Sequence, residues 1–509
     1  MLAGISTRFF ITLVTNMLRM GFSFYTGLTI ARFLGPNNYG NFSFLLGSFT
    51  ALINLVDLGS SSAFFTIISK KERSRKFYFY YAIWACIQFL ILLLFLFLLP
   101  DNILDRIWLG HSKNLVLLAL VASFSMNMIW KLSGQIGESI RDTFGVQARN
   151  LALAFLYLLC VLGLVVFKIL SVERLFVLNA IIYFLFSFLY VLRLYRTGTF
   201  SVSDEDNILS VFKEFKDFCS PLVIYTIFSF FYSFLDYWLL QRFGGSTQQG
   251  YYAVGLRFST VILIASTSIL QVFWKEISEA YSKGNITKVQ VLYSKVSKMF
   301  FFFSMAFCCF LIPFSRDIIT LFLGPEYMKA WATLSLMFFY PVHQSLGQIT
   351  STMLYAIGKT KTASYSGIFF MLLSIVTAYF VLAPRSSIVP GLELGSIGLA
   401  LKMVVCQIIG VNIWAFYVAK YINIPFDWRH QIRVLFFLPV GIFSKIFSDY
   451  LLTLILVKEY IILNMIFSGL LYLTILAILI YNFPEIAGLD TKQIKQGLST
   501  VRKRFYGSE

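Results

Sequence analysis

The stretch Arg32-Phe33-Leu34-Gly35-Pro36-Asn37-Asn38-Tyr39-Gly40-Asn41-Phe42 lies between the first two long apolar runs of the chain. It recurs 210 residues later as Arg242-Phe243-Gly244-Gly245-Ser246-Thr247-Gln248-Gln249-Gly250-Tyr251-Tyr252, with Arg, Phe and two Gly in register. A second internal match, at an offset near 213, pairs the segment from Pro100 to Gly110 with that from Pro313 to Gly324. The sequence therefore predicts two related halves.

The composition indicates which solvent surrounds these halves. Of the 509 residues, 58% are hydrophobic, 13% are charged and 56 are Phe. A soluble domain has about 25% charged residues, so this chain lacks the polar surface that a soluble protein of its length needs. We expect most of it to lie in the hydrocarbon of a membrane.

The apolar runs define the expected spans, since a helix that crosses the bilayer needs about 20 apolar residues. We expect an all-α polytopic membrane protein with about fourteen transmembrane helices, at residues 9–33, 42–67, 77–99, 115–140, 150–168, 175–193, 219–241, 252–274, 299–314, 331–357, 362–383, 392–418, 431–448 and 459–482.

The repeat pairs spans one to six with spans seven to twelve and so predicts two six-helix pseudo-symmetric lobes, at 1–200 and 210–420. Two additional helices follow at 421–483, and a polar tail at 484–509. Because six is even, both lobes run in the same direction across the membrane. Transporters with this plan bind substrate between the halves and work by alternating access.

The distribution of Lys and Arg predicts the orientation. With the N-terminus inside, 26 of the 42 basic residues, Arg149 among them, fall in inward segments and 10 in outward ones. Cytoplasmic loops retain positive charge, so we expect both termini in the cytoplasm and the chain in the cytoplasmic (inner) membrane. The net charge of +18 is spread over many loops that face membrane lipids, which argues against nucleic acid as a partner.

No motif for catalysis or for a cofactor is present in the sequence. The six Cys lie within apolar runs without metal-ligand spacing, and the chain has only 3 His. There is no phosphate loop and no nucleophile–base pattern. We expect no metal, no cofactor and no enzymatic activity.

Polar side chains recur at helical spacing inside several spans. A charge near the centre of a transmembrane helix costs about 2.5–3.5 kcal/mol on insertion scales and usually faces a cavity or a partner. The candidates for substrate binding are Asn16, Arg19, Asn127, Lys131, Gln135, Tyr225, Gln344, Gln348 and Lys402. The candidates for binding a coupling ion are Asp57, Asp236 and His343. Arg19, Lys131 and Lys402 predict a cationic bias near mid-depth.

Simpler interpretations apply to some of these residues. His343 follows Tyr340-Pro341 in a helix that we expect to be kinked, so a structural histidine is favoured over a proton site. Asp57 could be a structural partner of Arg19 rather than a substrate contact.

The stretch from Leu34 to Gly40, followed by Asp57-Leu58-Gly59-Ser60, is similar to the N-terminal signature of Wzx-type polysaccharide flippases. These belong to the multidrug/oligosaccharidyl-lipid/polysaccharide (MOP) exporter superfamily. The resemblance covers about residues 1–420, and further matching motifs are Gly250-Tyr251-Tyr252, Leu323-Gly324-Pro325-Glu326-Tyr327, Ala356-Ile357-Gly358-Lys359 and Gly395-Ser396-Ile397-Gly398-Leu399-Ala400.

The resemblance implies a two-lobed transporter that moves a polyprenyl-diphosphate-linked oligosaccharide to the outer leaflet for O-antigen, capsule or exopolysaccharide assembly, driven by an ion gradient. Other polysaccharide assembly proteins are then expected partners. Under this hypothesis Arg19 and Lys131 contact the diphosphate, while Tyr225 and Tyr232 contact sugar. The alternatives are a lipid II-type peptidoglycan precursor flippase, a MATE-type multidrug exporter and, with least support, a membrane polysaccharide polymerase.

Overall fold

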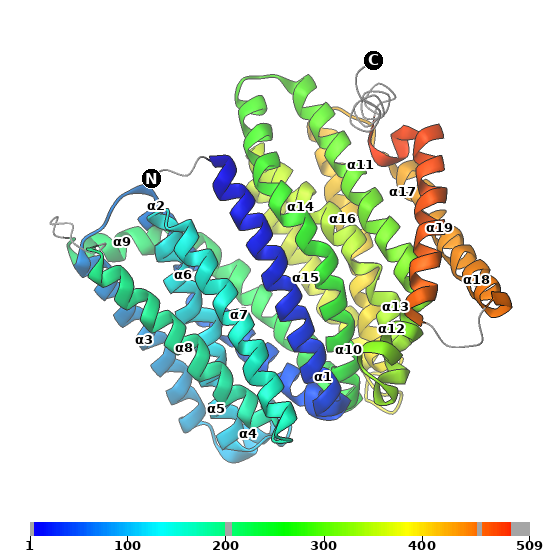
Figure 1. Cartoon of the computed structure of the whole chain (residues 1–509). Helices are drawn as coiled ribbons and strands as arrows, with labels where there is room; N and C mark the ends of the chain where they lie inside the picture. The colour runs from blue at the N-terminus through cyan, green and yellow to red at the C-terminus, as the bar shows by residue number, and fades with distance from the viewer. Residues whose placement is uncertain (1–4, 199–205, 456–460, 490–509) are drawn as a thin grey trace. The chain divides into compact units, whose positions relative to one another are not determined.

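The structure is a computed structural model that describes residues 5–198, 206–455 and 461–489. Within these ranges all regular secondary structure is helical (Figure 1). The α-helices are α1 (Ile5–Asp57), α2 (Ser60–Lys70), α3 (Arg75–Leu98), α4 (Asp101–Ile107), α5 (Lys113–Phe124), α6 (Trp130–Ser139), α7 (Thr143–Val166), α8 (Val172–Arg196), α9 (Ile208–Cys219), α10 (Val223–Ser282), α11 (Ile286–Leu311), α12 (Ser315–Phe322), α13 (Trp331–Met337), α14 (Tyr340–Ala356), α15 (Thr360–Leu382), α16 (Gly395–Tyr421), α17 (Trp428–Leu435), α18 (Phe437–Ile455) and α19 (Ile461–Asn482).

The expected spans fall on these helices, and the predicted fold class is confirmed. Eleven helical segments of the described chain are long and apolar enough to cross a membrane. Two of them, Val14–Asp57 and Ile208–Leu263, each overlap two expected spans. The tenth expected span corresponds to α13 and α14. Each of these helices is too short by itself to be counted among the membrane-crossing segments.

Two glycines bend the long helices at the repeated motif. Gly35 in α1 has φ 71° and ψ 166°, and Gly245 in α10 has φ 78° and ψ 173°. This left-handed conformation has little steric cost only for glycine. Pro36 follows the first bend, in the first turn of a new helical segment, where its missing N–H costs nothing. The same bend therefore occurs in both copies of the repeat.

The connection between the expected spans at 252–274 and 299–314 is largely helical. Helix α10 continues to Ser282 and α11 begins at Ile286, with a short turn between them. Asn285 caps α11 by accepting a hydrogen bond from the backbone N–H of Lys288 at 3.0 Å. These polar helical turns extend beyond the apolar stretches from which the spans were identified.

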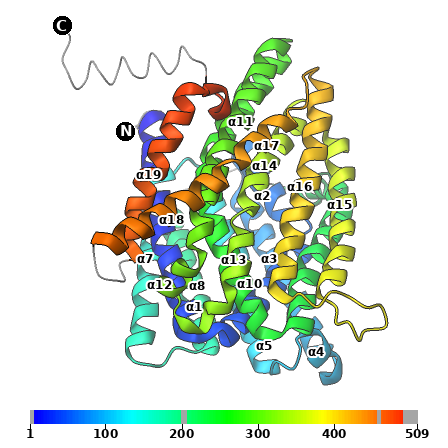
Figure 2. The same ribbon diagram turned by 90° about the vertical axis from the view of Figure 1, so that its right-hand side faces the viewer.

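The chain divides into two compact units. Unit 1 comprises residues 1–253 and 371–396, and unit 2 comprises residues 254–370 and 397–509. Within unit 1, α1 packs against α5 and α7, and α5 packs against α8. Within unit 2, α11 packs against α14 and α18, and α18 packs against α19 (Figure 2). The lobe limits derived from the repeat remain a proposal.

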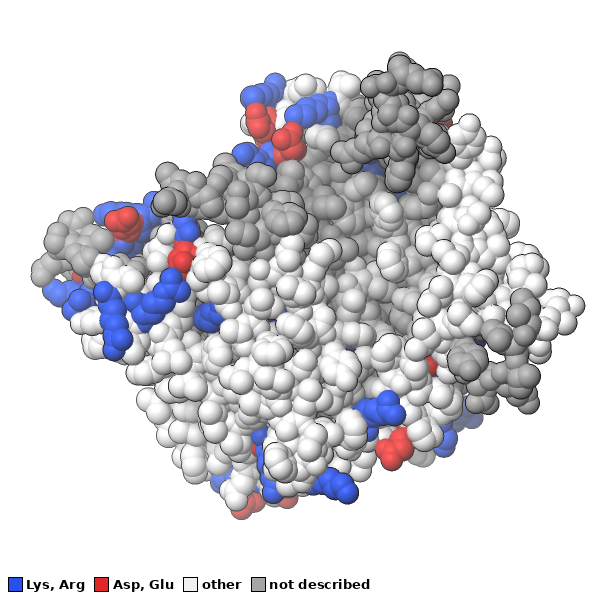
Figure 3. Space-filling view, in the orientation of Figure 1, with Lys and Arg blue, Asp and Glu red and all other residues white. Residues whose placement is uncertain are grey.

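On the face that Figure 3 shows, Lys, Arg, Asp and Glu lie mainly toward the upper and lower edges, and most of the described surface between them is uncharged. Large apolar side chains on the helices are exposed, such as Phe79, Phe144 and Val166. Water would disfavour this surface, whereas hydrocarbon does not. The protein is therefore a multi-pass membrane protein.

Candidate functional site

A carboxylate marks the break between α1 and α2. Asp57 is the last residue of α1, and Leu58 and Gly59 follow with φ of 49° and 82°. Asp57 Oδ1 accepts hydrogen bonds from Ser60 Oγ at 2.7 Å and from the backbone N–H of Ser61 at 2.9 Å. Its Oδ2 accepts one from Ser61 Oγ at 2.7 Å. The carboxylate thus satisfies a free N–H at the start of α2, as an N-cap residue does.

A lysine joins this carboxylate through a serine. Lys131 Nζ donates to Ser61 Oγ at 2.7 Å, and Ser61 Oγ donates to Asp57 Oδ2 at 2.7 Å. Among the described residues, Lys131 is connected to Asp57 through this serine and not by a direct ion pair. Lys131 is exposed, and it is the second residue of α6, which directly follows a π-helical turn at Ser125–Ile129. Such turns are frequent at functional sites.

Helix α3 supports the other serine. Ser60 Oγ accepts hydrogen bonds from Trp84 Nε1 and Gln88 Nε2, both at 3.1 Å, and lies 3.3 Å from the hydroxyl of Tyr81. These three α3 residues were not among the candidates from the sequence. A signal was present, because their spacing of three and four residues places them on one face of the helix.

Asp57 and Lys131 line a pocket of about 210 Å³ within unit 1. Tyr225, Ser229 and Ser233, from the first part of α10, also line it. These three residues recur every four residues within the expected seventh span, 219–241, and so share one face of the helix. The structure therefore brings together Asp57, Lys131 and Tyr225 of the candidate residues. The lining contains one lysine and one aspartate, so its formal charges balance. The cationic bias that the sequence predicts near mid-depth therefore remains a prediction.

Other candidates in unit 1 lie outside this lining. Asn127 Nδ2 donates to Thr50 Oγ1 at 3.1 Å and to the carbonyl of Ser123 at 3.0 Å. Arg19 is half-buried on α1 and is not among the donors to Asp57. Asn16 and Gln135 are half-buried, and Asp236 is buried in α10.

The remaining candidates lie in unit 2. His343 Nε2 is 3.3 Å from Gln431 Oε1, whose amide Nε2 donates to Asn412 Oδ1 at 2.6 Å. Gln344 accepts a hydrogen bond from Gln407. Gln348 is half-buried on α14, and Lys402 is buried on α16.

Arg149 is a buried basic residue, which the sequence did not indicate. It was assigned to an inward segment, but only 8% of it is exposed. Its guanidinium carbon lies 3.8 Å from the ring centre of Trp130 and 4.5 Å from that of Tyr190, and its Nη1 donates to Ser133 Oγ at 2.6 Å. Aromatic faces stabilise a cation that has left water. A count by position along the chain could not detect this burial.

Comparison with known proteins places these features in a family. The sequence model described as Polysaccharide biosynthesis protein matches residues 5–274, and the one described as MatE matches residues 221–380. None of the curated proteins compared matches the sequence.

Solved structures resemble the chain in fold. A lipid II flippase MurJ in an inward closed conformation has a TM-score of 0.66 at 16% identity, covering 93% of this chain and 99% of that chain. An inward-facing multidrug resistance MATE family transporter of the MOP superfamily has a TM-score of 0.58 at 17% identity, covering 82% and 99%. Because the first sequence model spans more than half of the chain, this protein belongs to the polysaccharide biosynthesis protein family and has the fold of the MOP superfamily.

Proposed function

We propose that the protein is a flippase that translocates a polyprenyl-diphosphate-linked oligosaccharide across the cytoplasmic membrane by alternating access. The cargo would be a repeat unit of O-antigen, capsule or exopolysaccharide. Membership of a polysaccharide biosynthesis family supports the glycan part of this proposal. The matched structures are described as a flippase and as transporters, which supports transport rather than catalysis.

The observation that carries the proposal is the hydrogen-bonded series from Lys131 through Ser61 to Asp57 at the edge of a polar pocket. Asp57 balances the lysine charge, so the ammonium can lie at a membrane-embedded site. The ammonium of Lys131 has three N–H groups, and one of them donates a hydrogen bond to Ser61 Oγ. The other two have no hydrogen-bond partner among the described residues. They can donate to a diphosphate oxygen as charge-assisted hydrogen bonds.

The rest of the lining suits a sugar. Tyr225, Ser229 and Ser233 offer hydroxyl groups that both donate and accept, and Tyr225 and Phe230 offer aromatic surface. The polyprenyl tail needs no polar contact and can stay in hydrocarbon.

Coupling to an ion gradient requires a group that binds the ion. We assign this role to Asp57 first, with Asp236 and His343 as further candidates. Protonation of Asp57 would remove an acceptor from Ser60 or Ser61 and weaken the start of α2. The ion site and the substrate site would then share the same serine.

A lipid II-type flippase is the second candidate. The MurJ structure matches 93% of this chain, whereas the multidrug transporter matches 82%. Lipid II also carries a polyprenyl diphosphate, so Lys131 would have the same role. Complementation of a strain depleted of its lipid II flippase distinguishes the two cargoes.

The test is complementation of a strain from which the gene has been deleted, scored by surface polysaccharide at matched protein levels in the membrane. Lys131→Met should lower surface polysaccharide about tenfold or more, equivalent to about 1.4 kcal/mol of lost interaction. Lys131→Arg should keep most of it. Lys113→Met is the matched control, because Lys113 is paired at 3.7 Å with the exposed Asp101, outside the pocket. Full activity of Lys131→Met would refute the proposed role.

A further inference from the structure

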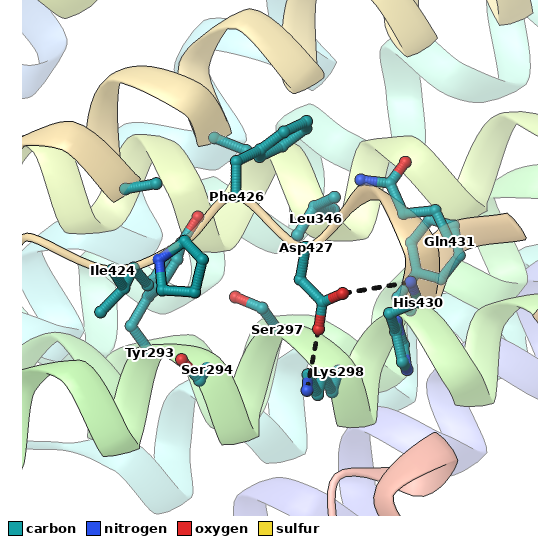
Figure 4. Close-up of a pocket in the computed structure, with 14 residues that line it drawn as sticks. Tyr293, Ser294, Ser297, Lys298, Leu346, Ile424, Phe426, Asp427, His430 and Gln431 are labelled. Carbon is teal, nitrogen blue, oxygen red and sulfur yellow. Dashed lines mark hydrogen bonds and ion pairs between the residues drawn. The ribbon is translucent and has the colours of Figure 1, made fainter. Parts of the chain in front are cut away.

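A second pocket, of about 210 Å³, lies in unit 2 between α11, α16 and α17. Figure 4 shows Asp427 at its centre, with Lys298 on one side and His430 on the other. Asp427 Oδ2 is 2.9 Å from Lys298 Nζ, and Asp427 Oδ1 accepts a hydrogen bond from the backbone N–H of His430 at 3.2 Å. The aspartate thus caps α17 and pairs with α11 at the same time.

The pocket lies at the boundary of the hydrocarbon. Helix α16 ends at Tyr421, and the next candidate span begins at Trp428, so the intervening residues connect two membrane-spanning helices outside the hydrocarbon. Exposed aromatic residues mark the same level, since Trp428 is exposed and Arg429 lies 5.8 Å from its ring centre. Trp, Tyr and basic residues are enriched at the level of lipid headgroups.

Both charges of the pair remain accessible. The exposed fraction of the side chain is 32% for Lys298 and 44% for Asp427. A zwitterionic ligand can therefore reach each charge with its own opposite charge. The hydroxyls of Ser294 and Ser297, between these charges and Tyr293, add hydrogen-bonding groups to the lining (Figure 4).

An apolar surface leads away from the pocket along α16. Phe426 lines the pocket, and its ring centre lies 6.3 Å from that of Phe416, which is 53% exposed. Ile409 and Ile413 on the same helix are also exposed. A molecule with a charged head and an apolar tail could contact the pocket and this surface together.

We propose that this pocket binds the headgroup of a zwitterionic phospholipid with a primary ammonium, the chemistry of ethanolamine. The phosphate pairs with Lys298 and the ammonium donates to Asp427, while the acyl chains follow Phe416. One intramolecular ion pair is replaced by two intermolecular ones, so neither charge loses its partner. An anionic headgroup would satisfy only Lys298 and would be repelled by Asp427. A choline headgroup has no N–H to donate.

The experiment measures lipid binding to the purified full-length protein by native mass spectrometry. The probes are phosphatidylethanolamine, phosphatidylcholine and phosphatidylglycerol with identical acyl chains. We expect phosphatidylethanolamine to bind about tenfold more tightly than either of the others. Binding of phosphatidylglycerol as tight as that of phosphatidylethanolamine would overturn the proposal, because it would show attraction to the lysine alone.

Substitutions identify the site. Asp427→Asn keeps an acceptor that can cap α17 but removes the charge, so the preference for ethanolamine over choline should disappear. Lys298→Met should weaken the binding of all three lipids, and Lys298→Arg should preserve the preference. If Lys298→Met does not fold, the comparison of Asp427→Asn with Lys298→Arg still decides the outcome.

The control is the Lys445–Asp317 pair, a second ion pair in unit 2 that lies outside this pocket. Asp317→Asn and Lys445→Met should leave the lipid preference unchanged. Equal effects of substitutions in the two pairs, or an unchanged preference in Asp427→Asn, would contradict a headgroup site at Asp427.

Discussion

Gly40 and Gly250 occupy equivalent positions in the repeat, and each lies against the main chain of the bend in the other copy. A Cβ on Gly40 would lie 1.7 Å from the carbonyl oxygen of Ser246, and a Cβ on Gly250 would lie 2.1 Å from that of Pro36. Pro36 and Ser246 are themselves 210 residues apart. The two copies therefore contact each other reciprocally, as residues related by a local two-fold axis do.

Because of this contact, a larger side chain at either glycine should lower the stability of the protein. Gly40→Ala or Gly250→Ala should destabilise the protein by about 2–4 kcal/mol, because a backbone carbonyl cannot yield as a flexible side chain can. The measurement is the thermal unfolding midpoint of purified protein. Gly163→Ala in α7 is the control, since a Cβ there meets nothing within 4 Å. Equal midpoints for Gly40→Ala and Gly163→Ala would show that the copies do not approach so closely.

The serine between Lys131 and Asp57 gives a prediction about transport. Ser61→Ala removes two side-chain hydrogen bonds and leaves the lysine without its acceptor, a loss of about 1–3 kcal/mol. Surface polysaccharide should fall, while the protein level stays near normal. Thr66→Ala on the same helix is the control, because the Thr66 hydroxyl donates to the carbonyl of Ser62 and has no other hydrogen-bond partner among the described residues. Normal transport by Ser61→Ala would exclude the serine from the mechanism.

The residues of α3 that contact Ser60 should also affect transport. Gln88→Leu removes a hydrogen bond to Ser60 Oγ and keeps a similar side-chain volume. We expect transport to decline less than in Lys131→Met, and its dependence on pH to shift, because Ser60 also donates to Asp57. Cys86→Ala, at an exposed position on the same helix, is the control. A lower protein yield with an unchanged pH profile would assign Gln88 a purely structural role.

The buried guanidinium predicts that lysine cannot replace arginine. Arg149→Lys loses the planar contacts with Trp130 and Tyr190 and should destabilise unit 1 by about 1–3 kcal/mol. Thermal unfolding measures the effect. Arg196→Lys, at the exposed end of α8, should change the midpoint little. An unaffected Arg149→Lys would show that charge alone suffices at this site.

The stability of the protein should depend on pH through the contact between the start of α3 and Asp206, which precedes α9. Burial alone would raise the pKa of Asp206, but hydrogen bonds from Ser74 and Arg73 outweigh burial and lower the pKa below its ordinary value of 3.8. A lowered pKa means that the stabilisation is complete above 3.8 and is lost as the pH falls through the lower folded-state value.

The measurement compares the unfolding midpoints of the wild type and Asp206→Asn across pH. Their difference should be constant at neutral pH and should shrink below the ordinary aspartate pKa. A difference that persists unchanged in acid would show that the carboxylate charge does not hold this contact.

Much of the fold could be predicted from the sequence, because hydrocarbon permits few backbone arrangements. Apolar runs in a bilayer must form helices that satisfy their own hydrogen bonds, and the expected spans lie on helices. The bends at Gly35 and Gly245 follow from the repeated glycines. The apolar runs do not give the full lengths of α10 and α11, because the polar helical turns at 275–298 lie beyond the apolar stretches.

The site was predicted less completely. Asp57, Lys131 and Tyr225 line one pocket, as polar stripes on neighbouring helices suggested. Arg19 does not line it, because depth along a helix does not specify the direction in which a side chain points. Trp84 and Gln88 were missed because an apolar span was treated as uniform, although their spacing on α3 contained the signal.

The most direct test of the proposed mechanism is the binding of a polyprenyl-diphosphate-linked oligosaccharide to purified protein, compared between the wild type, Lys131→Met and Lys131→Arg. We predict that Lys131→Met weakens binding about tenfold or more and that Lys131→Arg stays within about threefold of the wild type. Equal affinities of the wild type and Lys131→Met, with both proteins folded, would contradict a diphosphate site at this lysine.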